Sequence, residues 1–240
     1  MNGTNAAPLD IRYIPMIAYA EAWERQKEIV RSIDRGEGPE TLLLLQHPPT
    51  YTIGSQKHPE HLLLGEEELK ARGIRVFEID RGGDITYHGP GQLVGYPLLY
   101  LDPATLDLHG YLRSLEQVII EWLADYGIAA GRKEGYTGVW VGEEKIAAIG
   151  VKFNKARSRR GFITSHGFAL NLRAGIGKEG FAGIIPCGIR EYGVTSFEDV
   201  AGMPMPPDRA AREIVPHFCR VFGRTAGPLI EEEADAGDDG

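Results

Sequence analysis

The sequence predicts an α+β fold, a single domain with a mixed β-sheet and flanking helices. Short apolar runs typical of strands follow one another around one long amphipathic helix, without the strict strand–helix alternation of doubly wound folds. The chain has 240 residues, of which 42 % are hydrophobic, so it can bury a full core. Because no internal repeat or linker divides it, we expect one catalytic domain over residues 11–225.

The first half of the chain begins with an amphipathic helix. Apolar side chains from Met16 to Ile33 recur near helical spacing and Gly36 follows as a stop, which predicts a helix over 16–35. An apolar run at 41–45 has the length of a buried strand, and two prolines then turn the chain. Further short elements are expected as strands at 51–53 and 74–79 and as a helical turn or two at 66–72.

The second half contains the clearest helix. Six apolar residues are spaced alternately by four and three positions, the pattern of one helix face, and a glycine follows. They are Leu108, Leu112, Leu115, Ile119, Trp122 and Tyr126. A hairpin is expected from 138–141 and 145–153, and a further strand at 162–172. Residues 208–222 have helical spacing, but Pro216 should kink this helix or end its first half.

The two ends of the chain are expected to be flexible. Residues 1–10 predict a loose arm, and residues 231–240 an acidic tail without aromatic residues, although the whole chain has a net charge of only −8. No apolar run reaches the roughly 18 residues that suggest a membrane span, and the N-terminus lacks the features of a secretion signal. With only two cysteines, this predicts a cytoplasmic protein, and we expect a monomer with no membrane partner.

A basic stretch contrasts with the acidic whole. Between Lys145 and Lys178 the chain carries eight basic residues and no Asp or Glu, which favours an acidic partner. The stretch lacks a recognisable nucleic-acid-binding module, so a protein partner is the better interpretation and no nucleic acid is expected. A solvated surface loop is the alternative, above all for 155–160.

Cys187 lies in the stretch around which the sequence is organised, Phe181-Ala-Gly-Ile-Ile-Pro-Cys-Gly-Ile-Arg-Glu-Tyr-Gly-Val-Thr-Ser196. Pro186 fixes its own φ and Gly188 permits a positive φ, so the thiol is expected on a tight corner that faces a cleft. The alternative is a small buried hydrophobic residue, the commoner fate of a free cysteine and the one we expect for Cys219.

A glycine-rich segment, Arg81-Gly-Gly-Asp-Ile-Thr-Tyr-His-Gly-Pro-Gly-Gln92, follows a predicted strand. Its glycines let a ligand approach the backbone and its side chains supply donors, which indicates a binding loop. No Gly-Lys-Ser/Thr follows, so it is not a Walker phosphate loop, and it does not match the dinucleotide fingerprint. A glycine-rich turn with buried polar contacts is the structural alternative.

Lys145 and His166 are the remaining candidates. Lys145 opens the apolar strand 146–151, where its amine can be partly desolvated, although a strand-end lysine usually reaches water. A lone histidine such as His166 is more often structural than catalytic. Zinc binding by Cys187, His88 and His166 would lack closely paired ligands, so no metal is expected.

Together these segments resemble the lipoyl(octanoyl)transferases. The resemblance rests on the two segments quoted above, on Lys145-Ile-Ala-Ala-Ile-Gly150 and on Ser165-His-Gly-Phe-Ala-Leu-Asn171, which occur in order between about Leu42 and Ser196. It implies the single-domain fold of the biotin and lipoate protein ligases. It also implies transfer of octanoyl from acyl carrier protein to a lysine of lipoyl domains, those of 2-oxoacid dehydrogenase E2 subunits and the glycine cleavage H protein.

The resemblance further implies a thioester intermediate on Cys187, with Lys145 tuning the thiol, and no ATP or metal cofactor. The implied acyl pocket is built by Arg81, Gly82, Gly83, Asp84, Ile85, Thr86, Tyr87, His88, Ala148, Ile149, Gly150, Gly167, Phe168 and Ala169.

Three alternatives stay open. An ATP-dependent lipoate or biotin ligase of the same fold would not need Cys187. A non-catalytic module could bind acyl carrier protein or lipoyl domains, and a thiol hydrolase could pair Cys187 with His88 or His166, leaving Lys145 idle.

Overall fold

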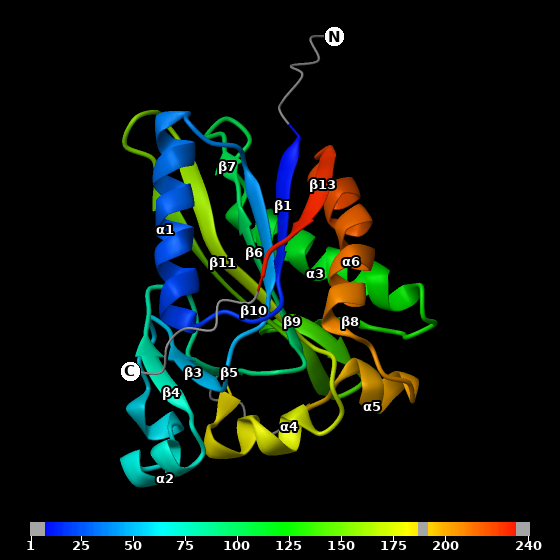
Figure 1. Ribbon diagram of the computed structural model, residues 1–240. Helices are drawn as coiled ribbons and strands as arrows, with labels where there is room; N and C mark the ends of the chain where they lie inside the picture. The colour runs from blue at the N-terminus through cyan, green and yellow to red at the C-terminus, as the bar shows by residue number, and fades with distance from the viewer. Residues whose placement is uncertain (1–7, 187–191, 234–240) are drawn as a thin grey trace.

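The computed structural model describes residues 8–186 and 192–233, and its main feature is one large mixed sheet (Figure 1). Strand neighbours run β13-β1-β2-β6-β11-β10-β9-β8, with β12 on β10 and β7 on β11. Pairs involving β1 are parallel, whereas the central pairs of β6, β10 and β11 are antiparallel. The strands are β1 Leu9–Ile14, β2 Thr41–Leu45, β6 Gln92–Leu98, β7 Tyr100–Leu101, β8 Gly131–Lys133, β9 Tyr136–Val141, β10 Glu144–Lys155, β11 Phe162–Asn171, β12 Gly193–Val194 and β13 Ala226–Glu231.

Helices cover both faces of this sheet. Helix α1, Tyr19–Arg35, packs on one face, while α3, Leu108–Ala124, and α6, Pro207–Phe222, pack together on the other (Figure 1). A larger apolar core forms under α3 and α6, and a smaller one forms under α1. The predicted mixed sheet with flanking helices is therefore confirmed.

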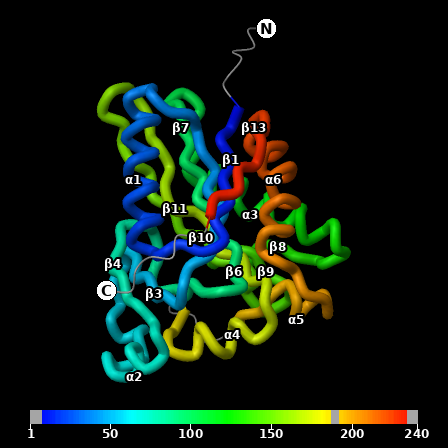
Figure 2. The backbone as a smooth tube through the Cα atoms, viewed as in Figure 1, coloured from blue at the N-terminus to red at the C-terminus, as the bar shows by residue number. Residues whose placement is uncertain are grey.

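A second, three-stranded sheet lies at one end of the large one, near α2 and α4 (Figure 2). Its order is β4-β3-β5, and it has its own small core around Tyr51, Ile85 and Tyr87. Its elements and the short helices are β3 Thr50–Ile53, β4 Arg75–Glu78, β5 Ile85–His88, α2 Glu66–Ala71, α4 Ile176–Glu179, α5 Phe197–Ala201 and the 3-10 turns Pro59–His61 and Phe181–Gly183.

The edges of the large sheet extend beyond the predicted domain. Strand β1 starts at Leu9, inside the segment 1–10 predicted to be a loose arm, and β13 ends at Glu231, where the flexible tail was expected. These two borders were wrong because β1 lies between β13 and β2, a pairing of the two chain ends that local sequence does not reveal. The remaining terminal residues, 1–7 and 234–240, lie outside the described residues.

Pro216 was expected to kink helix α6 or to end its first half; the helix continues through it, so the expected end is wrong and the kink stays a prediction. Proline removes one backbone donor, but α6 buries an apolar face against α3. Burial of Ile214, Phe218 and their neighbours outweighs the lost hydrogen bond, since each buried large side chain contributes about 2 kcal/mol.

One buried carboxylate joins α3 to the hairpin β8–β9. Glu116 is fully buried and accepts hydrogen bonds from Arg113 Nη1 at 2.7 Å, Arg132 Nε at 2.8 Å and the backbone N–H of Gly138 at 3.1 Å. These contacts span α3, β8 and β9 and fix the hairpin on the helix.

We predict that Glu116→Gln lowers the free energy of unfolding by about 2 kcal/mol, because the amide turns a donor toward two guanidinium groups. Chemical denaturation measures this loss. The matched control is Glu121→Gln, on the same helix but paired with Arg220 at the surface, which should cost less than about 1 kcal/mol. Equal losses for the two variants would contradict the prediction.

Candidate active site

A narrow pocket lies where the loop before β5 meets β10 and β11. It contains about 450 Å³ of empty space, its open mouth included. Its lining includes eleven of the predicted acyl-pocket residues, so segments far apart in sequence meet here. The lining is Tyr19, Arg81, Gly82, Gly83, Thr86, His88, Tyr96, Ala148, Ile149, Gly150, His166, Gly167, Phe168 and Ala169.

Glycines allow β10, β11 and the loop before β5 to approach one another closely around the pocket. Gly150 and Gly167 are partners across β10 and β11. A Cβ on Gly167 would stand 2.1 Å from the carbonyl oxygen of Gly95, and one on Gly150 would stand 3.0 Å from that of Gly82. The backbone N–H of Gly82 also donates to the carbonyl of Val151 at 2.9 Å, which ties the glycine-rich loop to β10.

Three predicted pocket residues do not line this pocket: Asp84, Ile85 and Tyr87. Successive side chains of a strand point to opposite faces, so β5 turns Thr86 and His88 toward the pocket and Ile85 and Tyr87 into the core of the small sheet. The Asp84 carboxylate instead makes a hydrogen bond with the imidazole of His61. Assigning all of residues 81–88 to the pocket overlooked this alternation.

A chain of buried hydrogen bonds begins at the pocket with Arg81. Its Nη2 donates to the Thr52 carbonyl at 2.7 Å and to Thr52 Oγ1 at 2.9 Å. Thr52 Oγ1 in turn lies 3.3 Å from His88 Nε2. Since His88 Nδ1 lies 3.0 Å from the Gln92 side-chain oxygen, which only accepts, Nδ1 carries the proton and Nε2 accepts from the threonine hydroxyl.

The chain continues from Gln92 to the strand that carries Lys145. The Gln92 amide donates to Asn171 Oδ1 at 3.0 Å, and the Asn171 amide donates to the carbonyl of Thr195 at 3.0 Å. The N–H of Thr195 donates to the carbonyl of Lys145 at 3.1 Å. Side chains of two motifs and backbone groups of the other two thus belong to one connected network, which we call the polar relay (Thr52, Arg81, His88, Gln92, Asn171 and Thr195).

The histidines around the pocket are held neutral by burial. Desolvation lowers the pKa of His47 to about 4. It also lowers the pKa of His88 well below its usual range, helped by the nearby His47 and Arg81. Desolvation lowers the pKa of His166 too, against the opposing effect of its hydrogen bond to Asp80. Neutral imidazoles suit a pocket for an uncharged ligand.

Lys145 does not line the pocket but stands at the start of β10, on the strand that forms its floor. Only 9 % of the residue is exposed, and its Nζ lies 4.9 Å from the centre of the Trp140 ring. Gly138, with φ of 129°, leaves room for the side chain, since a Cβ there would lie 3.3 Å from Lys145 Cε. The predicted strand-mouth lysine is therefore largely desolvated.

Cys187 lies outside the described residues, so its predicted corner stays a prediction. The chain is described up to Pro186 and again from Tyr192, and both residues border one surface pocket. From there β12 runs beside β10, with Val194 paired to Lys145, and the Tyr192 ring packs 5.5 Å from that of Trp140. The segment carrying Cys187 therefore rejoins the fold beside the lysine.

Two lining residues, Tyr19 and Tyr96, were not predicted. Tyr96 is a lone polar aromatic residue inside an apolar run, and its hydroxyl donates to His47 Nε2 at 2.8 Å. The sequence signal that could have found Tyr96 is a tyrosine within a buried strand, because such a tyrosine usually has a partner for its hydroxyl. Gln92 and Asn171 stand within the recognised motifs, but sequence alone gave them no role.

Comparison with known proteins identifies the family. The family model for the lipoyl protein ligase A/B catalytic domain matches residues 18–219. The chain belongs to this family. It is 52 % identical to an octanoyltransferase of Rubrobacter xylanophilus over 90 % of this chain and 95 % of the relative. It is 44 % identical to an octanoyltransferase of Caldicellulosiruptor saccharolyticus over 95 % and 94 %. The predicted resemblance is confirmed, and the chain is an enzyme.

Solved structures of the family share the fold. A lipoate-protein ligase A bound with ATP superposes with a TM-score of 0.68 at 17 % identity, covering 95 % of this chain and 90 % of the ligase. A bipartite lipoate protein ligase from Thermoplasma acidophilum, studied with its E2 lipoyl domain, gives 0.66 at 18 % identity, covering 94 % and 88 %. At such identities these matches establish the architecture alone.

Two further observations concern the described residues only. None of their helices is long and apolar enough to cross a membrane. Among them no group of three or more His, Cys, Asp or Glu side chains is placed to hold a metal ion. Cys219 is a buried free thiol within α6, as expected, and desolvation raises its pKa.

The neutral histidines predict a pH dependence of stability. Their folded-state pKa values lie below the unfolded value near 6.5, so the unfolded chain binds more protons as the pH falls. The free energy of unfolding should therefore decrease from about pH 6.5 toward pH 4. His47→Asn should reduce this slope by up to about 1.4 kcal/mol per pH unit. His109→Asn, at an exposed position, is the control; equal slopes in both variants would contradict the prediction.

Proposed function

We propose that this enzyme transfers an octanoyl group from acyl carrier protein to a lysine of lipoyl domains, through a thioester on Cys187. The observation that carries the proposal is the pocket itself, which brings together segments on which the resemblance to the octanoyltransferases rests and is lined in part by the strand of Lys145. The lining combines Ala148, Ile149, Phe168 and Ala169 with bare glycine backbone, which fits an alkyl chain. Burying such a chain contributes about 0.8 kcal/mol per methylene, several kcal/mol in total.

In the first half-reaction, the Cys187 thiolate attacks the carbonyl of the octanoyl thioester. An unperturbed thiol, with a pKa near 8.5, is only about 3 % ionised at pH 7, and a nearby ammonium favours the thiolate. The bond between the carbonyl and the pantetheine sulfur breaks, and the Lys145 ammonium donates its proton to that leaving sulfur. The octanoyl group is now on Cys187 and Lys145 is a neutral amine.

In the second half-reaction, the amine of the acceptor lysine attacks the new thioester. Lys145 accepts the proton that this amine loses, the Cys187 thiolate leaves, and an amide remains on the acceptor. Cys187 is then a thiolate and Lys145 an ammonium again, as they were at the start. A desolvated lysine beside an apolar pocket suits this role because water, which would hydrolyse the thioester, is kept away.

We propose that the reaction needs neither ATP nor a metal, because transfer from a thioester to an amine is downhill. The donor arrives already activated, so no adenylate has to form. The free-thiol nucleophile suits the reducing cytoplasm, and because pocket and lysine come from one chain, we propose a monomer.

The proposed acceptor is a lipoyl domain, and the proposed donor is acyl carrier protein. The ligase from Thermoplasma acidophilum, which has the same fold, was studied with its E2 lipoyl domain. For the acidic carrier, the basic loop between β10 and β11 offers the complementary charge. The Asp34 carboxylate of α1 accepts hydrogen bonds from the backbone N–H groups of Arg157 and Ser158, which fixes this loop.

The catalytic assignment is tested by intact-mass analysis after mixing the enzyme with octanoyl-loaded carrier protein in the absence of ATP. Wild type should gain one octanoyl mass, and Cys187→Ser should gain none because the weaker nucleophile is not activated. Lys145→Ala should slow the acylation by at least about 100-fold, as expected for loss of a general acid.

Lys70→Ala, at an exposed lysine of α2, is the control for Lys145→Ala and should react normally. Octanoylation of a lipoyl domain only with free octanoate and ATP would instead establish the ligase alternative. Tight carrier binding without any mass gain in wild type would establish the non-catalytic alternative.

Charge reversal tests the docking surface. Lys155 and Arg157 are exposed, whereas the Arg159 guanidinium stacks 3.7 Å from the Tyr100 ring and is better left in place. Lys155→Glu with Arg157→Glu should weaken carrier binding about 10-fold or more at low salt, and less at high salt because charges are screened. Lys70→Glu with Arg72→Glu, at exposed α2 positions, is the control. Unchanged affinity at low salt would remove this surface from the proposal.

A further inference from the structure

His166 stands in the pocket lining with an unusual backbone conformation. Its φ of 57° lies in the left-handed region that residues other than glycine rarely adopt within a strand. Its backbone N–H donates to Oε1 of Gln26 on α1 at 2.7 Å, and its Nε2 lies 3.0 Å from Oδ1 of Asp80. The imidazole is 98 % shielded from solvent, since only 2 % of the residue is exposed. Asp80 therefore holds the ring, and Gln26 holds the backbone that carries it.

The strand register places His166 at the end of the pocket that is remote from Lys145. Pocket residues pair across β10 and β11 from Ala148 with Ala169 to Gly150 with Gly167, and His166 occupies the next rung, opposite Val151. A Cβ on Gly138 would lie 3.3 Å from Lys145 Cε and 2.6 Å from the carbonyl oxygen of Ala147, so the lysine side chain extends along the strand to the level of Ala147. Ala147 precedes Val151 by four positions, which is about 13 Å along a strand. An extended octanoyl chain is roughly 10 Å long. A chain whose carbonyl reacts near Lys145 thus points its methyl end toward His166.

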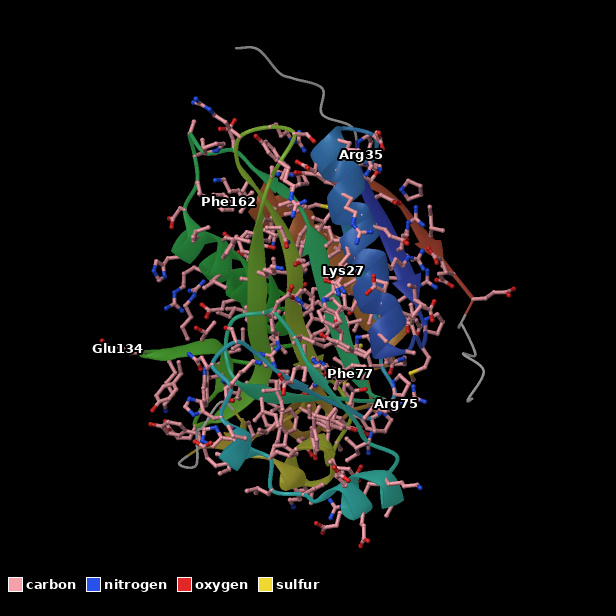
Figure 3. All side chains as sticks on the ribbon, turned by 90° about the vertical axis from the view of Figure 1, so that its left-hand side faces the viewer. Lys27, Arg35, Arg75, Phe77, Glu134 and Phe162 are labelled. Atoms are coloured by element: carbon pink, nitrogen blue, oxygen red, sulfur yellow. The ribbon has the colours of Figure 1, made fainter. Side chains whose placement is uncertain are left out.

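A wider groove lies next to the two residues that bond to His166, between α1 and strands β10 and β11. It holds about 1820 Å³ of empty space, measured as the 450 Å³ of the pocket is. Gln26 and Asp80, the two residues that hold His166, line this groove. Figure 3 views the molecule from this side, with α1 and its groove-lining Lys27 beside the long strands. His166 thus separates a narrow apolar pocket from an open groove.

We propose that His166 is the end wall of the acyl pocket and sets the upper limit of the acyl-chain length that the enzyme accepts. This inference rests on the octanoyl transfer proposed above. A chain of eight carbons ends at the imidazole, whereas a longer chain must displace a ring that Asp80 holds, on a backbone that Gln26 holds. Asp80 is a positioning residue, and its other carboxylate oxygen is engaged by Lys152. Without the ring, the pocket joins the groove and longer chains have an outlet.

The test compares kcat/KM for octanoyl-, decanoyl- and dodecanoyl-loaded carrier protein. His166→Asn and His166→Gly are the best variants, because asparagine and glycine both tolerate a positive φ and both shorten the side chain. In each, the ratio of the decanoyl to the octanoyl value should rise about 10-fold or more, the scale of one or two methylenes in an apolar pocket. Asp80→Ala should raise the same ratio by a smaller factor, since it only frees the ring.

His217→Asn is the matched control. His217 is also a buried histidine, and its Nε2 lies 2.8 Å from an aspartate oxygen, that of Asp125, but it belongs to α6 on the opposite face of the sheet. Its chain-length ratio should stay at the wild-type value. An unchanged ratio in every folded variant at His166 and Asp80 overturns the inference, as does an equal rise in His217→Asn. If wild type transfers no octanoyl from the carrier, the proposed function fails instead.

Discussion

The polar relay is the constraint on which the rest of the site depends. It starts at Arg81 beside the small sheet, includes His88 in the pocket lining and Gln92 behind it, and ends at Thr195 beside the strand of Lys145. Each buried polar group left without a partner would cost about 1–3 kcal/mol, so the chain of bonds favours one arrangement of both sheets. The same bonds position residues 81–92, which line part of the pocket, and the strand of Lys145.

The relay also explains how a polar wall can border an apolar pocket. Thr52, His88, Gln92 and Asn171 are uncharged and satisfy one another, so they need no water. A charged imidazole at His88 would donate from both ring nitrogens and lose the bond in which Nε2 accepts from Thr52. Burial and the guanidinium of Arg81 disfavour that state. The same burial that strengthens these bonds keeps out the water that would hydrolyse the proposed thioester.

Sequence revealed the parts of the site that local chemistry specifies. Gly150 and Gly167 belonged to recognisable motifs, and the structure explains each by the backbone atom that a Cβ would strike. Long-range pairing was less accessible. Strand β1 has alternating buried Leu9, Ile11 and Tyr13, yet it is held between β2 and a C-terminal strand, so its status depended on residues more than two hundred positions away. Tyr19 was missed for a similar reason: it lines the pocket from a helix that carries no recognisable motif, and only the fold brings it there.

The fold shared with lipoate-protein ligase A fixes the layers of the enzyme but not its chemistry, because a fold can host many reactions. What distinguishes the proposed reaction is its donor. A thioester donor brings its activation with it, whereas a free acid needs a nucleotide held beside the carboxylate. In the proposed reaction, carrier and acceptor both react at the Cys187 thiol and so must approach it in turn. The proposed covalent intermediate meets this requirement, because the acyl chain can stay in its pocket while one large protein leaves and the other arrives.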